Sequence, residues 1–527
     1  MKKPLLLLLF SLIIIIYIIG YTSTQKKTNI KDVNGDGLSD ILIGSPGVSL
    51  NGIITTRKTL EVASGEAYLF YGNKNGISNC DFSISQCKPD VTFKGEGGFF
   101  GKQLSIIGDI NGDGFSDIAI GAHQAGKKKE GLVYIFYGSP NLRENFSSSD
   151  ADILFYGEES GDGFGWNVKS AGDINGDNFI DIIIGAPYAG PINEGQAYIF
   201  LGGKTISNKV IIKDATTIIN GAFENDGFGT AVASVGDINN DGFDDFAVTA
   251  PLADIDNNLD VGKVYIFNGD KNWAKKNIKY CDLSSKNCTP DSIIIGENSE
   301  DFFGYSISTA NDVNGDNFDD IVIGAFKYGE GVDGFSVIGR AYIFLGSQEG
   351  INNCDMFSKN CISDTTITGG FGDWLGTDVS YAGDVNNDGY SDILIGADLA
   401  GYVKGGETYL FFGSPSGIKS CTTNTRFVNF KTTPSDNCFP YAIIRGEYGS
   451  DLMGTNNTFV SAGDINGDGF NDILVGSVSI PGYAFSDKEL AGRVYLLLGP
   501  LNTSSNLSNA NTTFTGKYPW SWFGIVR

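Results

Sequence analysis

The sequence predicts an all-β fold: a seven-bladed β-propeller of four-stranded antiparallel blades, with the ring closed by pairing of the N- and C-terminal segments. Three observations predict it. One unit recurs along the 527 residues, each unit holds short apolar runs separated by glycine, and the first unit lacks a run whose counterpart stands at the C-terminus. Units of this size must bury their apolar faces on one another. Each unit has one acidic segment, and these begin at Asp32, Asp109, Asp173, Asp237, Asp312, Asp384 and Asp464.

Four runs typical of β-strands follow one another in each unit. The first begins at an apolar-glycine pair such as Phe164-Gly165 and ends at the acidic segment. The second follows that segment, as in residues 181–187, and the third carries Gly-x-x-Tyr-x-x-x-Gly, as in residues 131–138. A β-rich run such as residues 292–296 closes the unit. Short runs of Ile, Val, Tyr and Phe, punctuated by glycine, predict one antiparallel blade per unit, and radial repetition of blades forms a propeller.

The ends of the chain predict how the ring closes. The first unit has no apolar-glycine run of its own, while an unused Phe523-Gly524 pair stands near the C-terminus. We therefore expect the missing strand to be shared between the two termini, so that the last residues complete the first blade. The expected propeller spans residues 28–527.

The acidic segments predict metal-binding loops. Each reads Asp-x-Asn-x-Asp-(Gly/Asn)-x-x-Asp, and the loops span residues 32–40, 109–117, 173–181, 237–245, 312–320, 384–392 and 464–472. Side-chain oxygens at positions 1, 3, 5 and 9, with the carbonyl oxygen of position 7, can surround one hard cation. Gly or Asn at position 6 permits the tight turn that this requires. Such an oxygen set fits Ca²⁺, which takes roughly 6 to 8 oxygens.

These loops differ from an EF-hand, which has a glutamate ligand at position 12 and flanking helices. Here position 12 falls within an apolar run, so we expect a site between two strands and up to seven structural Ca²⁺ ions. Three carboxylates in one turn repel one another without a cation, so metal binding should be coupled to folding. The expected ligands are Asp32, Asn34, Asp36, Leu38, Asp40, Asp109, Asn111, Asp113, Phe115, Asp117, Asp173, Asn175, Asp177, Phe179, Asp181, Asp237, Asn239, Asp241, Phe243, Asp245, Asp312, Asn314, Asp316, Phe318, Asp320, Asp384, Asn386, Asp388, Tyr390, Asp392, Asp464, Asn466, Asp468, Phe470 and Asp472.

Composition excludes one class of partner and indicates export. A formal net charge of −25 and a single histidine argue against nucleic-acid binding, since a phosphate backbone needs clustered Lys and Arg. Residues 1–24 combine two lysines with an apolar stretch, which predicts a signal peptide or an N-terminal signal anchor. An uncleaved segment would leave residues 5–20 as a membrane tether. Its apolar stretch of about 15 residues is short for a bilayer span of roughly 20, which favours cleavage.

Eight cysteines predict disulfides and an oxidising compartment. They fall in the connections between repeats, and three pairs share one sequence separation. A zinc site would need Cys-x-x-Cys spacing or accompanying histidines, which the chain lacks. The expected pairs are Cys80 with Cys87, Cys281 with Cys288, Cys354 with Cys361, and Cys421 with Cys438.

The motifs resemble a known repeat. Phe-Gly before the loop and Gly-Ala-Pro after it, clearest from Phe164-Gly165 to Gly185-Ala186-Pro187, resemble the FG-GAP repeats of integrin α-subunit propellers and their bacterial relatives. The triplet departs from the pattern in other units, for example at His123 and Asp398. The resemblance implies that the acidic loops and the cysteine-bearing connections share one face. It also implies that a protein or glycan ligand binds the opposite face, whose connections include residues 47–64, 123–130, 254–260, 326–334 and 478–489.

The resemblance and the repeated loops predict an extracellular or cell-surface, calcium-binding adhesion or ligand-binding module, with a propeller that is monomeric. The first alternative is a structural scaffold of the cell surface, and the second is a secreted hydrolase or polysaccharide lyase. We expect no enzyme, because the chain has one histidine and no Gly-x-Ser-x-Gly motif, and because carboxylates repeated in every unit suit structural metals. Aromatic contacts to a ligand, or packing at the rim of the blades, are the two roles expected for Tyr188, Tyr328, Trp374, Tyr402 and Tyr448. His123 is expected to be a turn residue.

Overall fold

The computed structural model describes residues 31–47, 64–84, 86–273, 279–285, 288–329, 337–400, 406–423, 440–446, 459–477, 492–501, 505–516 and 525–526. The chain divides into two compact units, Met1–Ile30 and Lys31–Arg527, and all elements described below belong to the second. The expected signal segment 1–24 and the Phe523-Gly524 pair lie outside the described residues. None of the helices in the described ranges combines the length and apolarity that crossing a bilayer requires.

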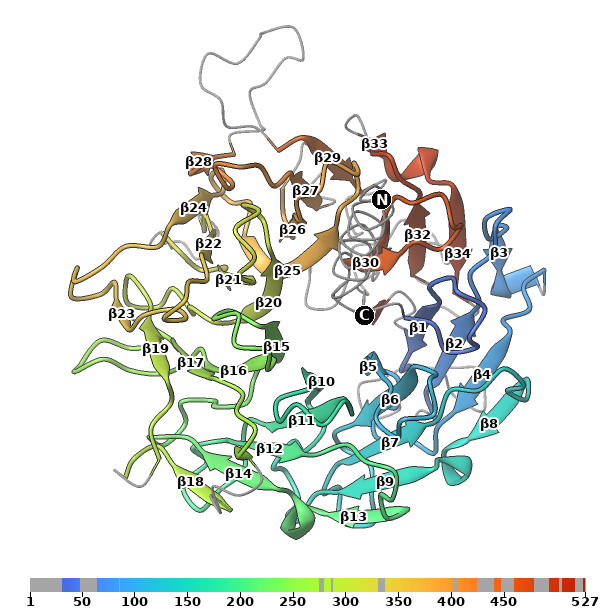
Figure 1. Cartoon of the computed structure of the whole chain (residues 1–527), viewed down its shortest axis with the longest axis horizontal. Helices are drawn as coiled ribbons and strands as arrows, with labels where there is room; N and C mark the ends of the chain where they lie inside the picture. The colour runs from blue at the N-terminus through green and yellow to red at the C-terminus, as the bar shows by residue number, and fades with distance from the viewer. Residues whose placement is uncertain are drawn as a thin grey trace, which may run out of the picture. The chain divides into compact units, whose positions relative to one another are not determined.

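Seven sheets follow one another around a ring, which confirms the predicted propeller (Figure 1). We number these blades I to VII in the order of their acidic loops. In blades II to VII the strand that precedes the acidic loop lies nearest the centre of the ring, and in blade I a strand from the C-terminus takes this place. The second, third and fourth strands follow outward (Figure 1). These four strands pair antiparallel, as the sequence predicts.

From blade I to blade VII the innermost strands are β35 (Ile525–Val526), β5 (Gln103–Gly108), β10 (Asn167–Gly172), β15 (Val232–Gly236), β20 (Ser306–Asn311), β25 (Leu375–Gly383) and β30 (Phe459–Gly463). The second strands are β1 (Ile41–Ser45), β6 (Asp117–Ala122), β11 (Asp181–Ala186), β16 (Asp245–Ala250), β21 (Asp320–Ala325), β26 (Asp392–Ala397) and β31 (Asp472–Ser477). The third strands are β2 (Glu66–Phe70), β7 (Leu132–Phe136), β12 (Gln196–Phe200), β17 (Lys263–Phe267), β22 (Arg340–Phe344), β27 (Glu407–Phe411) and β32 (Arg493–Leu497). The fourth strands are β4 (Val91–Lys94), β9 (Ile153–Tyr156), β14 (Thr217–Asn220), β19 (Ser292–Ile295), β24 (Thr365–Thr368), β29 (Ala442–Arg445) and β34 (Thr512–Thr515).

Each sheet also has a fifth strand, which the prediction of four-stranded blades missed. This strand belongs to the following unit, between its third and fourth strands, and pairs parallel with the fourth strand of the preceding blade. The fifth strands, from blade I to blade VII, are β8 (Asn145–Ser147), β13 (Lys209–Ile211), β18 (Tyr280–Asp282), β23 (Cys354–Asp355), β28 (Cys421–Thr422), β33 (Ser505–Asn506) and β3 (Cys80–Asp81). Short 3-10 helices follow some of them: η1 (Phe82–Ile84), η2 (Ser148–Asp150), η3 (Ile212–Asp214) and η7 (Leu507–Asn509). Two or three residues carry no readable periodicity, so only the neighbouring blade reveals them as strands.

The ring closes through two seams. On the inside, β35 pairs antiparallel with β1, with Ile43 opposite Val526, so the C-terminal segment completes blade I as predicted. On the outside, β3 of the first unit pairs parallel with β34 of the last, with Cys80 opposite Phe514. The second seam was not predicted, because it uses the fifth strand.

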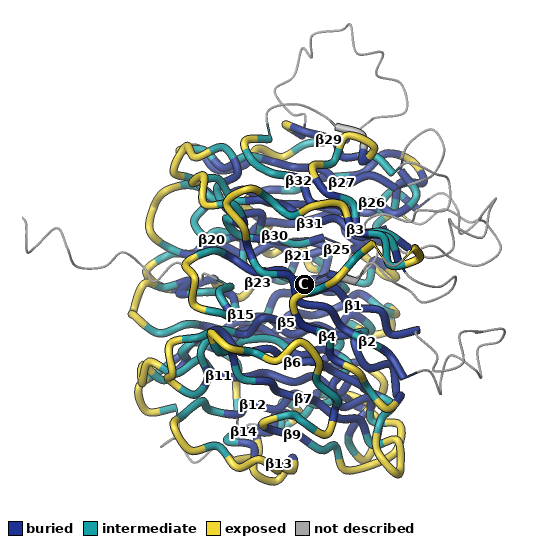
Figure 2. The backbone as a smooth tube through the Cα atoms, turned by 90° about the vertical axis from the view of Figure 1, so that its right-hand side faces the viewer, coloured by how far each residue is buried: buried dark blue, intermediate teal, exposed yellow. Residues whose placement is uncertain are grey.

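The hydrophobic core lies between successive blades. Each buried cluster in the described residues combines side chains of two neighbouring blades, and one of them joins blade I to blade VII. Figure 2 shows the strands as largely buried and many of the connections as exposed. Within a blade, the Phe of the apolar-glycine pair packs edge-on against the Tyr of the third strand, as Phe164 does on Tyr198 at 5.4 Å between ring centroids. The two sequence motifs are therefore two sides of one buried contact.

Candidate metal centres

In blades II to VII the acidic loop joins the first strand to the second, and in blade I it leads into the second strand. Since every second strand starts at position 9 of its loop, or one residue later in blade I, and runs in the same sense, all described loops lie at one end of the blades. The connections that follow the second strands leave the opposite end. The structure thus supports the two faces that the sequence analysis assigned by resemblance.

The loop of blade II shows how the acidic side chains are held. Asp109 at position 1 accepts the N–H groups of Gly112, Asp113 and Gly114 at 2.6, 3.1 and 2.8 Å. Asn111 at position 3 accepts the N–H of Asp113 at 2.8 Å and donates its side-chain amide to the carboxylate of Asp113 at 3.0 Å. Asp113 at position 5 accepts the N–H of Phe115 at 3.0 Å. Three oxygen-bearing side chains are thereby folded into one turn.

The same network recurs in the other loops. In each of them position 1 accepts the N–H groups of positions 5 and 6, and position 5 accepts the N–H of position 7. Positive φ at position 6, expected from its Gly or Asn, is found in every loop, for example 94° at Gly114. Position 4 also has positive φ throughout, for example 78° at Gly112 and 54° at Asn240. The signal for this second turn residue, Gly or Asn at position 4, was present in the sequence and was overlooked.

Position 9 has a different environment from positions 1, 3 and 5. Asp117 is fully buried, and its two carboxylate oxygens accept the N–H of Ile110 at 3.0 Å and the N–H of Gly138 at 2.8 Å. Burial raises the pKa of Asp117 to about 8, the two N–H bonds oppose this rise, and the charges of Asp113 and Asp109 add to it. The equivalent pKa values are raised to about 7 or 8, again by burial first, at Asp40, Asp181, Asp245, Asp320, Asp392 and Asp472.

The donor set of each loop fits a hard cation by its chemistry. Carboxylates at positions 1, 5 and 9 and an amide at position 3 supply oxygens, and no loop position carries a basic side chain. In the residues that the structure describes, no three Asp, Glu, His or Cys side chains are arranged so that they could hold a metal ion. Their oxygens face loop N–H groups instead. Where a carboxylate oxygen accepts a single N–H, as Oδ2 of Asp109 does from Gly114, its second lone pair remains able to accept a metal bond.

On the opposite face, aromatic rings of blades II and III form a contiguous row. His123 stacks on Phe99 at 5.3 Å and meets Trp166 edge-on at 4.9 Å, and Trp166 meets Tyr188 at 5.7 Å. The ammonium group of Lys102 lies 4.6 Å from the Trp166 ring. His123 is buried in its turn, and this burial, with Lys102 nearby, lowers its pKa to about 3. Tyr188 is 48% exposed, so the row ends at the surface.

A second aromatic group lies on the same face. The ring of Phe326 is 4.4 Å from Tyr305 and 5.8 Å from Trp374, and the guanidinium of Arg340 lies 3.6 Å from the ring of Tyr328. Tyr328 and Trp374 are thus engaged with neighbouring side chains. Tyr402 and Tyr448 lie outside the described residues, as do most of residues 47–64 and 478–489 and part of 326–334.

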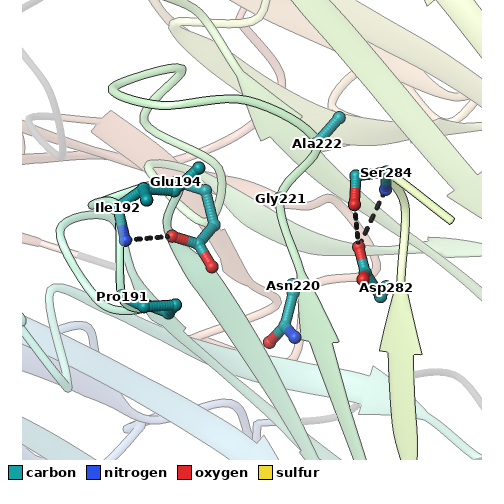
Figure 3. Close-up of a pocket in the computed structure, with 8 residues that line it drawn as sticks. All are labelled: Pro191, Ile192, Glu194, Asn220, Gly221, Ala222, Asp282 and Ser284. Atoms are coloured by element: carbon teal, nitrogen blue, oxygen red, sulfur yellow. Dashed lines mark hydrogen bonds between the residues drawn. The ribbon is translucent and has the colours of Figure 1, made fainter.

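A small pocket of about 260 Å³ opens beside the end of blade III (Figure 3). Its two carboxylates are held by their own loops: Glu194 accepts the N–H of Ile192 at 3.0 Å, and Asp282 accepts that of Ser284 at 2.9 Å. The pocket therefore indicates no ligand class by itself. Its lining residues are Pro191, Ile192, Glu194, Asn220, Gly221, Ala222, Asp282 and Ser284.

Three of the expected disulfides are present: Cys80–Cys87, Cys281–Cys288 and Cys354–Cys361. Cys421 is also disulfide-bonded, while Cys438, its expected partner, lies outside the described residues. Each bridge begins in a fifth strand, where the chain crosses to the preceding blade. Disulfides in such short loops fit an extracellular protein.

Comparison with known proteins identifies the repeat. The family model described as "FG-GAP repeat" matches residues 100–136, 164–200, 228–267, 303–338, 377–411 and 456–497. These are the units of blades II to VII. The unit of blade I is unmatched, and its innermost strand comes from the other end of the chain.

Curated relatives include integrin α subunits and phospholipases. The chain is 34% identical to integrin alpha-V of Gallus gallus over 235 residues, which cover 42% of this chain and 19% of that protein. It is 30% identical to phosphatidylinositol-glycan-specific phospholipase D of Bos taurus over 212 residues, covering 38% of this chain and 23% of the enzyme. It is 28% identical to the enzyme of that name from Dictyostelium discoideum over 328 residues, covering 58% of this chain and 32% of the enzyme. The matches therefore span less than a third of these relatives.

The expectation that the chain is not an enzyme is overturned by these matches, because its relatives include phosphatidylinositol-glycan-specific phospholipase D, at about 30% identity and over part of the chain. The arguments from the single histidine and the absent serine motif addressed particular catalytic sites.

Among solved structures, the WD40 domain of Toxoplasma gondii coronin superposes with a TM-score of 0.43 and 6% identity, covering 81% of this chain and 80% of that one. This likeness is too distant to bear on function. The repeat family, the sheet topology and the curated relatives agree: the chain is an FG-GAP repeat β-propeller, similar to integrin α subunits and to phosphatidylinositol-glycan-specific phospholipase D.

Proposed function

We propose that the protein is an extracellular, calcium-binding propeller that acts as an adhesion or ligand-binding module. Structural Ca²⁺ would be held in the acidic loops, and a protein or glycan ligand would bind the opposite face. The observation that carries the calcium proposal is the recurrence of one oxygen-donor set and one hydrogen-bond network in all seven loops. A catalytic site is normally unique, whereas a structural ion suits every repeat.

Within each loop the residues have separate tasks. Positions 1, 3 and 5 supply exposed or half-buried oxygens, apart from the buried Asp237, and position 9 supplies a buried carboxylate at or next to the start of the second strand. When bound, a calcium ion would neutralise the carboxylates and tie the turn to that strand. Because the folded chain alone offers this arrangement, binding should stabilise the fold.

Elemental analysis of the purified full chain, combined with thermal unfolding, tests the calcium proposal. We expect several equivalents of calcium per chain and a melting temperature that falls strongly in EGTA. Added Ca²⁺ should restore it and Mg²⁺ should not, because Mg²⁺ demands stricter octahedral geometry. A chain that carries no calcium and melts identically in EGTA would refute this part of the proposal.

The aromatic row on the face opposite the loops supports the ligand proposal. Tyr188 and Trp166 present amphipathic ring surfaces of the kind enriched at binding interfaces. Glycan arrays and pull-downs from cell-surface extracts should give a saturable ligand whose binding is lost in the double variant Trp166→Ala, Tyr188→Ala. Absence of any saturable ligand would favour the scaffold alternative.

The phospholipase relatives give a second candidate: the chain contributes to cleavage of a phosphatidylinositol-glycan. The match to the Dictyostelium discoideum enzyme, over 58% of this chain, favours testing it. Incubation of the full chain with a phosphatidylinositol-glycan-anchored protein in detergent should then release the protein from the detergent phase. If all of the anchored protein stays in the detergent phase, the cleavage candidate is refuted and the binding role remains.

A further inference from the structure

The acidic loops contact one another in one direction around the ring. In every described pair, the N–H at position 8 of one loop donates to the carbonyl oxygen at position 1 of the preceding loop. Around the ring these bonds are Ser116→Asp32, Ile180→Asp109, Asp244→Asp173, Asp319→Asp237, Ser391→Asp312, Asn471→Asp384 and Ser39→Asp464, at 2.9 to 3.2 Å. The last bond joins blade I to blade VII, so the chain of bonds is closed.

A second set of bonds follows the same direction. The carbonyl oxygen at position 2 accepts an N–H from the third residue after the third strand of the following blade, as Ile110 does from Gly203 at 2.8 Å. Equivalent bonds are Ser139→Val33, Asp270→Ile174, Ser347→Ile238, Ser414→Val313 and Asn73→Ile465. Pro500 occupies the donor position facing Val385 and has no N–H to give.

Side chains complete the contact. The ring of Phe179, at position 7 of blade III, lies against Gly112 at position 4 of blade II and leaves no room for a β-carbon there. The same pairing joins Phe115 to Gly35, Phe243 to Gly176, Tyr390 to Gly315, and Leu38 to Gly467. At two junctions a carboxylate also reaches back: Asp244 and Asp319 accept the N–H at position 1 of the preceding loop, Asp173 and Asp237, at 2.8 and 2.9 Å.

We infer that each acidic loop is shaped by the loop of the following blade, so that the affinity of a loop for its metal is set by residues one blade downstream. At Gly112 and its glycine equivalents, position 4 adopts positive φ, and the downstream side chain occupies the space where a β-carbon would stand; Asn240 and Asn387 hold this position in the other two loops. The carbonyl at position 1 is likewise oriented by a downstream N–H. The part concerning metal affinity rests on the proposed calcium function, whereas the part concerning loop shape does not.

A substitution at position 7 can distinguish an effect on the residue's own loop from an effect on the preceding loop. The carbonyl oxygen of this residue is an expected ligand of its own loop, and its side chain contacts the preceding loop. Phe179→Ala keeps the carbonyl in loop 173–181 and removes the ring from Gly112 in loop 109–117. Phe179→Leu is the matched control, because Leu38 already fills this role against Gly467.

Hydrogen–deuterium exchange of the full chain, followed peptide by peptide with and without calcium, tests the inference. In Phe179→Ala we expect the amides of loop 109–117 to exchange about tenfold faster, because a packed aromatic contact to that loop is lost. Loop 173–181 should change less, and Phe179→Leu should stay near the parent chain. Calcium titration should show weaker protection of loop 109–117 than of loop 173–181.

Two failures are distinguishable. If calcium protects no loop of the parent chain, the calcium proposal fails. The exchange rates without calcium still decide whether the conformation of each loop depends on the loop of the following blade. If Phe179→Ala loosens loop 173–181 and leaves loop 109–117 unchanged, the inference is overturned even where calcium binds.

Discussion

Gly185 of blade III packs directly against the backbone carbonyl oxygen of Gly229 of blade IV, with no room for a β-carbon at Gly185. Gly185 belongs to the Gly-Ala-Pro triplet and Gly229 to the Phe-Gly pair, so the two halves of the repeat signature touch across a blade junction. The same contact joins Gly44 to Gly101, Gly121 to Gly165, and Gly324 to Gly376. The repeat signature therefore encodes the spacing between blades.

Gly185→Ala should destabilise the propeller by about 3 kcal/mol, because the added methyl group overpacks a backbone contact that cannot yield. Urea unfolding measures the loss. Gly161→Ala is the control: no atom lies within 4 Å of its added β-carbon, although its φ is 97°. It should cost only about 1 kcal/mol, from its positive φ. Equal losses in the two variants would contradict the contact argument.

Removal of residues 522–527 should weaken ring closure, because β1 then loses the strand that pairs with it at Ile43 and Gly44. We expect a lower melting temperature and faster amide exchange in residues 41–45. Val526→Ala is the control, since it trims a buried side chain and keeps the backbone pairing. The outer seam between β3 and β34 should persist in both. A truncated chain as stable as the parent would show that β35 does not close the ring.

Replacement of both Cys80 and Cys87 by Ser should cost about 2 kcal/mol, the value for closing a loop of this size in the unfolded chain. Because the bridge begins in β3, this change should also expose the outer seam to proteases. The double replacement of Cys354 and Cys361 is the matched control. These two cysteines have the same sequence separation, but their strand β23 pairs with blade IV, away from the seam between blades I and VII. Limited proteolysis should separate them, and identical digestion patterns would argue against a special role of the seam.

His123 should remain neutral in the folded protein well below its ordinary pKa. Its folded pKa is lowered to about 3 by burial and by Lys102, against about 6.5 in the unfolded chain. The unfolded chain thus binds more protons at this residue below pH 6.5, so the contribution of His123 to stability, present above that pH, is lost as the pH falls, by about 2 kcal/mol at pH 5. Because this is the single histidine of the chain, NMR can follow its ring protons directly. The control His123→Phe, chosen because Phe326 stands at the equivalent position of blade V, should lack the pH-dependent loss; a ring signal that titrates near pH 6.5 would refute burial.

Asp113→Asn should remove about one calcium equivalent per chain without unfolding the propeller, because the amide still accepts the N–H of Phe115 while one carboxylate charge is lost. Isothermal titration calorimetry measures the stoichiometry. Asp152→Asn removes the same charge from a residue outside the loops, where it accepts the N–H of Tyr137 at 2.8 Å. Unchanged stoichiometry in Asp113→Asn would exclude this loop as a calcium site.

The sequence by itself determined the repeat, the number of blades and the four antiparallel strands of each. These follow from local patterns: spacing of Phe-Gly pairs, apolar runs such as residues 181–187, and Gly-x-x-Tyr motifs. It also determined the cysteine pairs at short separation and the completion of blade I by the C-terminus. The acidic loops could be located in the same way, since each is one continuous segment, while their role as metal ligands stays a prediction.

Only the tertiary structure decided which residues of neighbouring blades contact one another. The fifth strands, the outer seam at Cys80 and Phe514, and the contact of Phe179 with Gly112 join residues of different units. A repeat pattern specifies each unit but not which atoms meet across a junction, because those contacts depend on the twist and register of two packed sheets. For the same reason the full burial of Asp117 could not be read from a loop motif, since its second carboxylate oxygen is satisfied by Gly138 after the third strand.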